Sequence, residues 1–267
     1  SPRVSAGSIL KEIEVQQGIL VERSRNIYSF SHLTFQEFLT ARYIIDNQKT
    51  SELIDNFIFE ERWREVFLLM AGLVSGRHGA DEMLLALESK VKDFKKGKTL
   101  QNLICWVSEA EHKINLKGIK PSAKRATAIA YAFREFRDYL PSKKESLTYH
   151  RSRSLARKLD YNPDKAIDNT FFLNQNRNRV LARMSYFGGN SSSIPSHSNT
   201  PHQSIEGIIN SWLNLTEMEL DFSEDELDDI NKYLYAVDLM LDCKFSATRI
   251  SSDLWEGIEL RLLTLPD

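Results

Sequence analysis

The sequence predicts a mostly α-helical protein that carries one small β-hairpin near its first residues. Only 11 Gly and 7 Pro interrupt the 267 residues, and through most of the chain apolar residues recur at the 3.6-residue spacing of an amphipathic helix. Two short runs, 19–22 and 27–30, are instead rich in aliphatic and aromatic residues and are joined by four polar residues. That spacing is typical of a β-hairpin.

The beginning of the chain predicts a helix, a hairpin and a second helix, in that order. The apolar residues of segment 8–17 lie on one helical face, and Gly18 stands where helices commonly end with a glycine. We expect the second helix to begin at Thr34, whose side chain can cap it while Glu37 stands three residues later in capping-box position. This order of elements predicts the C-terminal part of a winged-helix domain, which we assign to residues 1–47.

From residue 51 onward the sequence predicts only helices, and together they predict a multi-helix array for which stacked helix pairs are one packing. Pro121 stands in the first-turn position that proline tolerates. Ser223 precedes Glu226 by three residues, which again predicts a capping box. The expected helices cover residues 51–59, 63–74, 81–94, 100–110, 122–140, 148–158, 165–184, 205–215, 224–243 and 251–263.

A segment without apolar periodicity divides this array. Residues 188–203 read GGNSSSIPSHSNTPHQ, and a Gly-, Ser- and Pro-rich stretch with a single aliphatic residue cannot anchor a core. We therefore predict a helical domain at 48–187, a flexible linker at 188–203, and a C-terminal helical segment at 204–267 that packs on the helical domain.

The composition excludes several classes of protein. Apolar residues make up 42% and charged residues 27%, as in ordinary folded soluble proteins. No run of 18 apolar residues and no signal peptide occurs, so we expect a cytoplasmic protein without membrane contact. The net charge of −2 excludes a globally basic nucleic-acid binder. Cys105 and Cys243 are too few for a disulfide framework, and we expect both as buried thiols.

The charges are strongly segregated along the chain. Residues 112–165 hold 14 Lys and Arg against 5 Asp and Glu, whereas residues 204–243 hold 11 Asp and Glu against one Lys. Such blocks can dock onto each other, present two partner surfaces, or form two solvated faces. Within the basic block, four cations could contact the phosphates of a nucleic acid or an acidic partner: Arg151, Arg153, Arg157 and Lys158.

Residues 28–43, YSFSHLTFQEFLTARY, carry a family resemblance. An aromatic residue, a histidine two residues later, then Phe-Gln-Glu-aromatic and Ala form a pattern that resembles the end of the winged helix in NACHT-type (STAND) signal-transduction ATPases, many of them bacterial or cyanobacterial defence proteins. The resemblance covers residues 8–75 and 205–265, and the central residues 110–200 show none. The matching positions are Phe30, His32, Phe35, Gln36, Glu37, Phe38 and Ala41.

The resemblance implies a role for His32. In related proteins the winged-helix histidine reaches the β-phosphate of bound ADP in the autoinhibited state, and an imidazole can donate such a hydrogen bond. The alternative is a histidine packed between hairpin and helix. We expect Phe30, Phe35 and Phe38 to belong to the core, and Gln36 and Glu37 to make capping or interdomain contacts.

The sequence offers no catalytic machinery. Gly97-Lys98-Thr99 is not a phosphate loop, because position 92, where the first glycine should stand, is Lys92 and no strand precedes it. We also expect no metal site, since His197 and His202 share only the linker. We therefore expect no cofactor and no enzymatic activity in this chain, and ATP or ADP with Mg²⁺ in the parent protein.

The leading hypothesis is a regulatory and sensory C-terminal region of a NACHT-type signalling ATPase, with a role in defence or signal transduction. By resemblance, it holds the upstream ATPase domain of the same protein autoinhibited until an unidentified ligand engages the helices, and release permits self-association. The alternative is a nucleic-acid-binding module that uses the winged helix or the segment 151–158.

Overall fold

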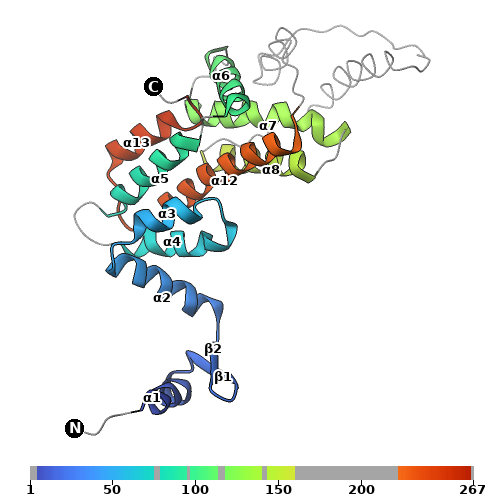
Figure 1. The fold of residues 1–267 in the computed structure, drawn as a ribbon. Coiled ribbons are helices and arrows are strands. Elements are labelled where there is room, and N and C mark those ends of the chain that lie inside the picture. Colours follow the sequence, from blue (N-terminus) through green and yellow to red (C-terminus); the bar gives the residue numbers. More distant parts are fainter. Residues whose placement is uncertain are drawn as a thin grey trace. The chain divides into compact units, whose positions relative to one another are not determined.

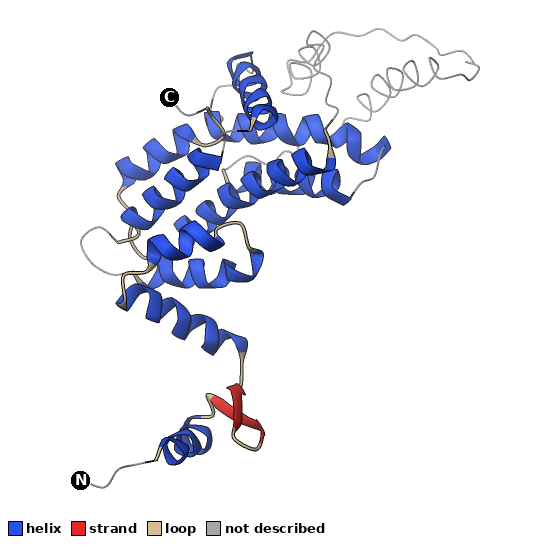
Figure 2. Cartoon of the chain, viewed as in Figure 1, coloured by secondary structure: helices blue, strands red, loops and turns tan. Residues whose placement is uncertain are grey.

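The structure is a computed structural model that describes residues 5–74, 79–94, 97–113, 118–139, 143–159 and 222–265. In these residues nearly every element is a helix, and the strands shown in red form a two-stranded sheet (Figure 2). The predicted helices at 165–184 and 205–215, the predicted linker, and His197 and His202 lie outside the described residues. The predominantly helical fold with one hairpin confirms the predicted fold class.

The chain divides into two compact units, and Figure 1 labels the elements that belong to them. The first unit comprises Ser1–Lys90 and Leu239–Leu254, and the second comprises Val91–Asp238 and Trp255–Asp267. Helix α12 (Glu224–Ser246) therefore contributes residues to both units. The domain ranges expected from the sequence follow composition instead, and they stay a prediction.

The first unit begins with the expected helix and hairpin. Helix α1 (Ala6–Glu12) continues into the π-helical turn η1 (Ile13–Gln17), which ends at Gly18 in the left-handed conformation with φ +63°. The strands β1 (Leu20–Ser24) and β2 (Ile27–Phe30) pair antiparallel, with Leu20 opposite Phe30. Two predictions are therefore confirmed: Gly18 ends the first helical segment, and the two runs after it form a hairpin.

Helix α2 (Leu33–Asp46) begins one residue earlier than expected, and its N-terminus is not capped as predicted. His32 occupies the N-cap position, and no side chain accepts a hydrogen bond there. The capping box proposed for Thr34 and Glu37 is therefore wrong. Because the helix begins only three residues after β2 ends, Thr34 already lies inside the first helical turn.

The other helices of the first unit pack against the second half of α2 and the second half of α12. They are α3 (Thr50–Phe57), the 3-10 turn η2 (Glu61–Trp63), α4 (Arg64–Leu73) and α5 (Asp81–Phe94), whose last four residues belong to the second unit. Arg64 on α4 forms an ion pair with Asp242 on α12. The buried apolar residues include Ile44, Leu53, Ile54, Val66, Phe67, Met70, Leu84, Leu87 and Met240.

The segment 246–251, which begins at the last residue of α12, runs beside the end of α4 and the start of α5, and we call it the strap. The Thr248 hydroxyl donates to the Gly72 carbonyl at 2.9 Å, and the Ala80 amide donates to the Arg249 carbonyl at 3.1 Å. The Ser251 amide donates to the Asp81 carboxylate at 2.9 Å. Each of these bonds uses at least one backbone group, and two of them also require a side chain, the Thr248 hydroxyl and the Asp81 carboxylate.

The elements of the second unit that the structure describes are all helices. It contains α6 (Lys98–Lys113), α7 (Pro121–Tyr139), α8 (Lys143–Lys158), the first part of α12 and most of α13 (Ser252–Arg261). Pro121 is the first residue of α7, as predicted. The Ser223 capping box is confirmed, since the Glu226 carboxylate accepts the Ser223 amide at 2.9 Å. The core includes Leu103, Ile104, Val107, Ala126, Ile129, Phe133, Leu155, Leu227, Ile230 and Leu234.

A buried arginine fastens the end of the chain to α7. Arg125 is only 3% exposed. Its guanidinium donates to the carbonyls of Leu262 and Leu260, at 2.8 and 2.6 Å, and forms an ion pair with Glu111. Because the three guanidinium nitrogens each reach a different acceptor, a single residue holds the end of α13 and the turn after it in place.

Candidate functional site

The candidate site lies where the hairpin passes into α2. The Ser31 amide donates to the Ile19 carbonyl at 2.8 Å, which fixes the end of β2. His32 follows with extended backbone, φ −134° and ψ 144°, and its side chain is exposed. Its ring lies 6.0 Å from that of Phe35, centroid to centroid. The imidazole is therefore held at the surface rather than packed between hairpin and helix.

An uncovered apolar surface surrounds this histidine. Phe35 and Phe38 are 38% and 41% exposed, and Leu33 is 66% exposed. The expectation that Phe35 and Phe38 belong to the core is wrong, and Phe30 is only half-buried. Only the second half of α2, from Ala41 onward, contributes buried residues. We call this set the α2 apolar face: Phe35, Phe38, Leu39 and Tyr43.

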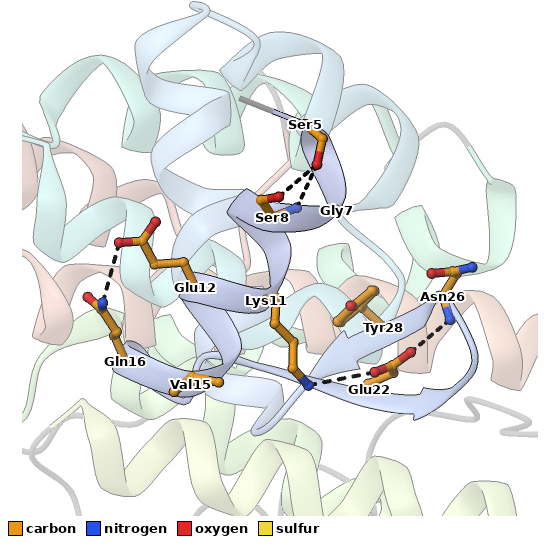
Figure 3. A pocket seen from close by; sticks show the side chains of 10 residues that line it. All are labelled: Ser5, Gly7, Ser8, Lys11, Glu12, Val15, Gln16, Glu22, Asn26 and Tyr28. Atoms are coloured by element: carbon orange, nitrogen blue, oxygen red, sulfur yellow. Dashed lines mark hydrogen bonds and ion pairs between the residues drawn. The ribbon is translucent and has the colours of Figure 1, made fainter. Parts of the chain in front are cut away.

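The hairpin and α1 together form an open pocket of about 690 Å³ (Figure 3). Lys11 lies at its centre, 2.8 Å from Glu14 and 3.9 Å from Glu22. The hydrogen bond with Glu14 raises the pKa of Lys11 and lowers the pKa of Glu14. These charges pair with one another across the pocket, so they join the hairpin to α1 and offer no reactive group.

The basic cluster predicted for phosphate or acidic-partner contact lies on α8, and two of its members face α12. The Arg151 guanidinium donates to the Asn231 carbonyl at 2.7 Å and lies 5.2 Å from the centre of the Tyr235 ring. Lys158 lies 2.7 Å from a carboxylate oxygen of Asp238. Arg157 is exposed, and Arg153 is half-buried.

Sequence reasoning missed Lys144, which is the first of the α8 cations that contact α12. Lys144 lies 2.8 Å from Asp228 and 2.9 Å from Glu224, and these carboxylates raise its pKa, Asp228 most strongly. The signal that could have found it is its spacing, since Lys144 precedes Arg151 by seven residues, two turns of a helix. The structure thus brings part of the basic block against the acidic block.

The described residues show little else that could serve chemistry. They contain no group of three or more His, Cys, Asp or Glu side chains arranged to hold a metal ion. Cys243 is buried, which raises the pKa of its thiol, whereas Cys105 is exposed. The prediction of a buried Cys105 is wrong, because that residue falls between the buried pairs 103–104 and 106–107 of α6.

Among the described residues, no helix has the length and apolar character needed to cross a bilayer.

Two family matches bear on identity. Residues 5–44 match the family described as "Winged helix-turn-helix domain C-terminal to NACHT", which covers α1, the hairpin and most of α2. Residues 194–266 match "NACHT C-terminal Helical domain 2", which includes α12 and α13. No curated protein and no solved structure matches the chain. Both matches are to modules that follow NACHT domains, and their presence in one chain supports a C-terminal region of a NACHT-type protein.

Proposed function

We propose that this chain is the regulatory and sensory C-terminal region of a NACHT-type signalling ATPase, without catalysis of its own. The winged-helix residues hold the upstream ATPase domain of the same protein in its ADP-bound state. The helical units receive a ligand whose binding releases this hold, which permits nucleotide exchange and self-association. The proposed setting is defence or signal transduction in the cytoplasm.

The observation that carries this proposal is the α2 apolar face beside an exposed histidine. Large apolar side chains gathered at helical spacing on an exposed surface mark an interaction site. Their neighbour Ala41, one turn further, is fully buried in the array. One helix therefore serves two purposes, since its second half anchors it to α4 and its first half is available to another folded part, which we take to be the ATPase domain.

The donors at this site fit a phosphate. His32 carries a ring N–H at the N-cap of α2, and no side chain caps the backbone amides of the first helical turn. Helix N-termini favour anions through these amides and the helix dipole. A nucleotide held by the ATPase domain would supply the charged phosphate, whereas His32 would report its position by one hydrogen bond.

The test uses the full-length protein with His32→Ala and, as a matched control, the exposed His150→Ala on α8. A charge-assisted hydrogen bond contributes about 1.5–3 kcal/mol, so His32→Ala should weaken ADP binding by at least about tenfold and raise the basal rate of nucleotide exchange. His150→Ala should change neither. Unchanged ADP affinity in His32→Ala would remove His32 from the proposal.

A second test addresses the α2 apolar face. Phe38→Ser together with Leu39→Ser should leave the array folded, because both side chains are already about half exposed, but should release the full-length ATPase from inhibition. Leu85→Ser, at a similarly exposed leucine on α5, is the control. If both variants behave as the wild type in ATPase assays, the face is not the contact with the ATPase domain.

The alternative function, nucleic-acid binding, has less support. Arg151 and Lys158 are engaged with α12, so they would have to leave these partners to bind phosphates. Arg157 is exposed and lies on the same helix. A mobility shift that weakens steeply with salt and with Arg151→Glu plus Arg153→Glu would favour this alternative.

A further inference from the structure

Residues 5–31, which include α1, η1 and the hairpin, contain no buried side chain. We call them the helix–hairpin segment. Within residues 5–74, the first buried residue is Ala41 in the second half of α2, whereas α4 alone buries Val66, Phe67, Met70 and Ala71. A two-stranded hairpin is only marginally stable in water, and chains shorter than about 40 residues rarely build a sufficient core. The helix–hairpin segment is therefore the least covered part of residues 5–74.

The polar contacts of the helix–hairpin segment are internal. Lys11 pairs with Glu22, whose carboxylate accepts the Asn26 amide at 2.9 Å (Figure 3). The Glu22 amide in turn donates to the Glu14 carboxylate at 2.9 Å. No hydrogen bond or ion pair leads from these residues to any other residue that the structure describes. Because such exposed contacts stabilise weakly, the segment gains little from them.

The exposed apolar surface is concentrated in the same part of the chain. Among the described residues, 12 large apolar side chains are exposed, and 8 of them lie between residues 9 and 43. Three belong to the helix–hairpin segment, namely Ile9, Val15 and Ile27, which are 46%, 72% and 61% exposed. Single exposed apolar residues are ordinary, but a concentration of this kind marks a surface that another folded part covers.

We propose that the helix–hairpin segment folds stably only while the upstream ATPase domain of the same protein covers it, so that release from inhibition unfolds the segment. A segment that orders on contact opposes that contact with its own loss of entropy. Order-to-disorder change is one of the ways in which proteins switch. The contact with the ATPase domain is then weak enough for ligand binding at the helical units to break it.

Two observations identify the ATPase domain as the cover. The family that residues 5–44 match is described as C-terminal to NACHT, which places such a domain upstream in the same protein. The α2 apolar face follows the helix–hairpin segment directly in the chain and is assigned to the same contact. The inference thus rests on the proposed function, and it adds that the contact controls the folding of residues 5–31.

The first test is amide hydrogen exchange in two proteins. In the 267-residue chain alone, the helix–hairpin segment should exchange less than about a hundredfold slower than an unfolded peptide. The amides of α4 should exchange at least about a thousandfold slower. In the full-length protein with ADP, the protection of the segment should come within about tenfold of that of α4. A non-hydrolysable ATP analogue in place of ADP should remove most of this added protection.

Two glycines test the coupling without the loss of any side chain. Gly18 has φ +63° and Gly7 lies in α1, and an added Cβ would meet nothing within 4 Å at either position. Gly18→Ala strains the folded segment, so it should speed ADP release from the full-length protein by about five- to thirtyfold. Gly7→Ala favours the helix, so as the matched control it should not speed ADP release.

The outcomes separate this inference from the proposed function. If the 267-residue chain protects the segment as well as α4, the inference is overturned and the proposed function is unaffected. Protection in the full-length protein that does not depend on the nucleotide would overturn it as well, because the cover would then be permanent. A segment that exchanges rapidly in both proteins would remove the ATPase domain as its cover and count against the proposed function too. Equal ADP release from the two glycine variants would also refute the coupling.

Discussion

Replacing Gly79 by alanine should destabilise the first unit more than any other Gly-to-Ala change discussed below. Gly79 has φ +52°, and a Cβ there would overlap the Arg249 carbonyl oxygen and lie 3.0 Å from the Arg249 carbonyl carbon. The left-handed conformation costs alanine about 1–2 kcal/mol. Moving the strap away would also lose the bond from the Ala80 amide to that oxygen, worth about 0.5–1.5 kcal/mol. We expect a total cost of about 2–3 kcal/mol in the free energy of unfolding.

Two other glycines separate the contributions to this cost. Gly18 has φ +63° but nothing within 4 Å of its added Cβ, so Gly18→Ala measures the backbone strain alone. Gly72 lies within α4, where its Cβ would approach the Ser246 carbonyl oxygen at 3.2 Å. Gly72→Ala therefore measures close approach to the strap without strain, offset by the better helix propensity of alanine, about 1 kcal/mol.

The assay is urea denaturation followed by circular dichroism, with hydrogen exchange to locate the loss. Gly79→Ala should accelerate exchange in α5 and in the segment 246–251, whereas Gly18→Ala should affect only the hairpin and α1. The reasoning is refuted if Gly79→Ala costs no more than Gly18→Ala, since the close approach of the strap would then contribute nothing.

Three further predictions concern the second unit and the two thiols. Arg125→Met should lower the free energy of unfolding by about 3–5 kcal/mol, because it leaves the partly buried Glu111 carboxylate and two backbone carbonyls without their donor. Urea denaturation checks this, with Arg157→Met at an exposed site as the control, and equal losses in the two variants would contradict it. The pKa of Glu226 is lowered, chiefly by its hydrogen bond with the Thr99 hydroxyl. The Glu226 carboxylate therefore contributes to stability at pH values above its unfolded pKa of 4.5, and this contribution is lost as the pH falls through the lower pKa of the folded state. Urea midpoints measured between about pH 5 and pH 3 should therefore fall less in Glu226→Gln than in the wild type, and parallel curves would show that the carboxylate adds nothing. Iodoacetamide should label Cys105 in the folded chain and Cys243 only after unfolding, and mass spectrometry of the native protein showing a labelled Cys243 would contradict its burial.

Local pattern was sufficient for most of the described helices and for three of the four expected terminal signals. Gly18 and Ser223 each lie at the end of a clear apolar repeat, so their roles follow from chain geometry alone. The Thr34 prediction was wrong because the pattern Thr-x-x-Glu occurs inside a first helical turn as well as in a capping box. Only the short connection from β2 to α2 decides between these two positions. The π-helical turn 13–17 had no signal in the sequence.

What covers a surface could not be predicted from periodicity. The repeat that includes Phe35 and Phe38 identifies an apolar face, but the same repeat would appear whether or not the chain itself covers that face. The partners of Lys144 and Lys158 lie 80 positions or more away, beyond any local pattern. Charge segregation predicted docking as one possibility, and it could not specify which residues pair.

The continuity of α2 has a mechanical consequence. Its 14 residues span about 21 Å, and its hydrogen-bonded backbone does not bend without a break such as a proline. With its second half embedded beside α4 and the hairpin attached to its start, the helix acts as a lever. The free part from Ala41 back to Leu33 is about 12 Å long, so a tilt of about 20° at Ala41 would carry the far end by about 4 Å, more than the reach of a hydrogen bond. A small repacking among helices is therefore enough to withdraw His32 from any group that it touches.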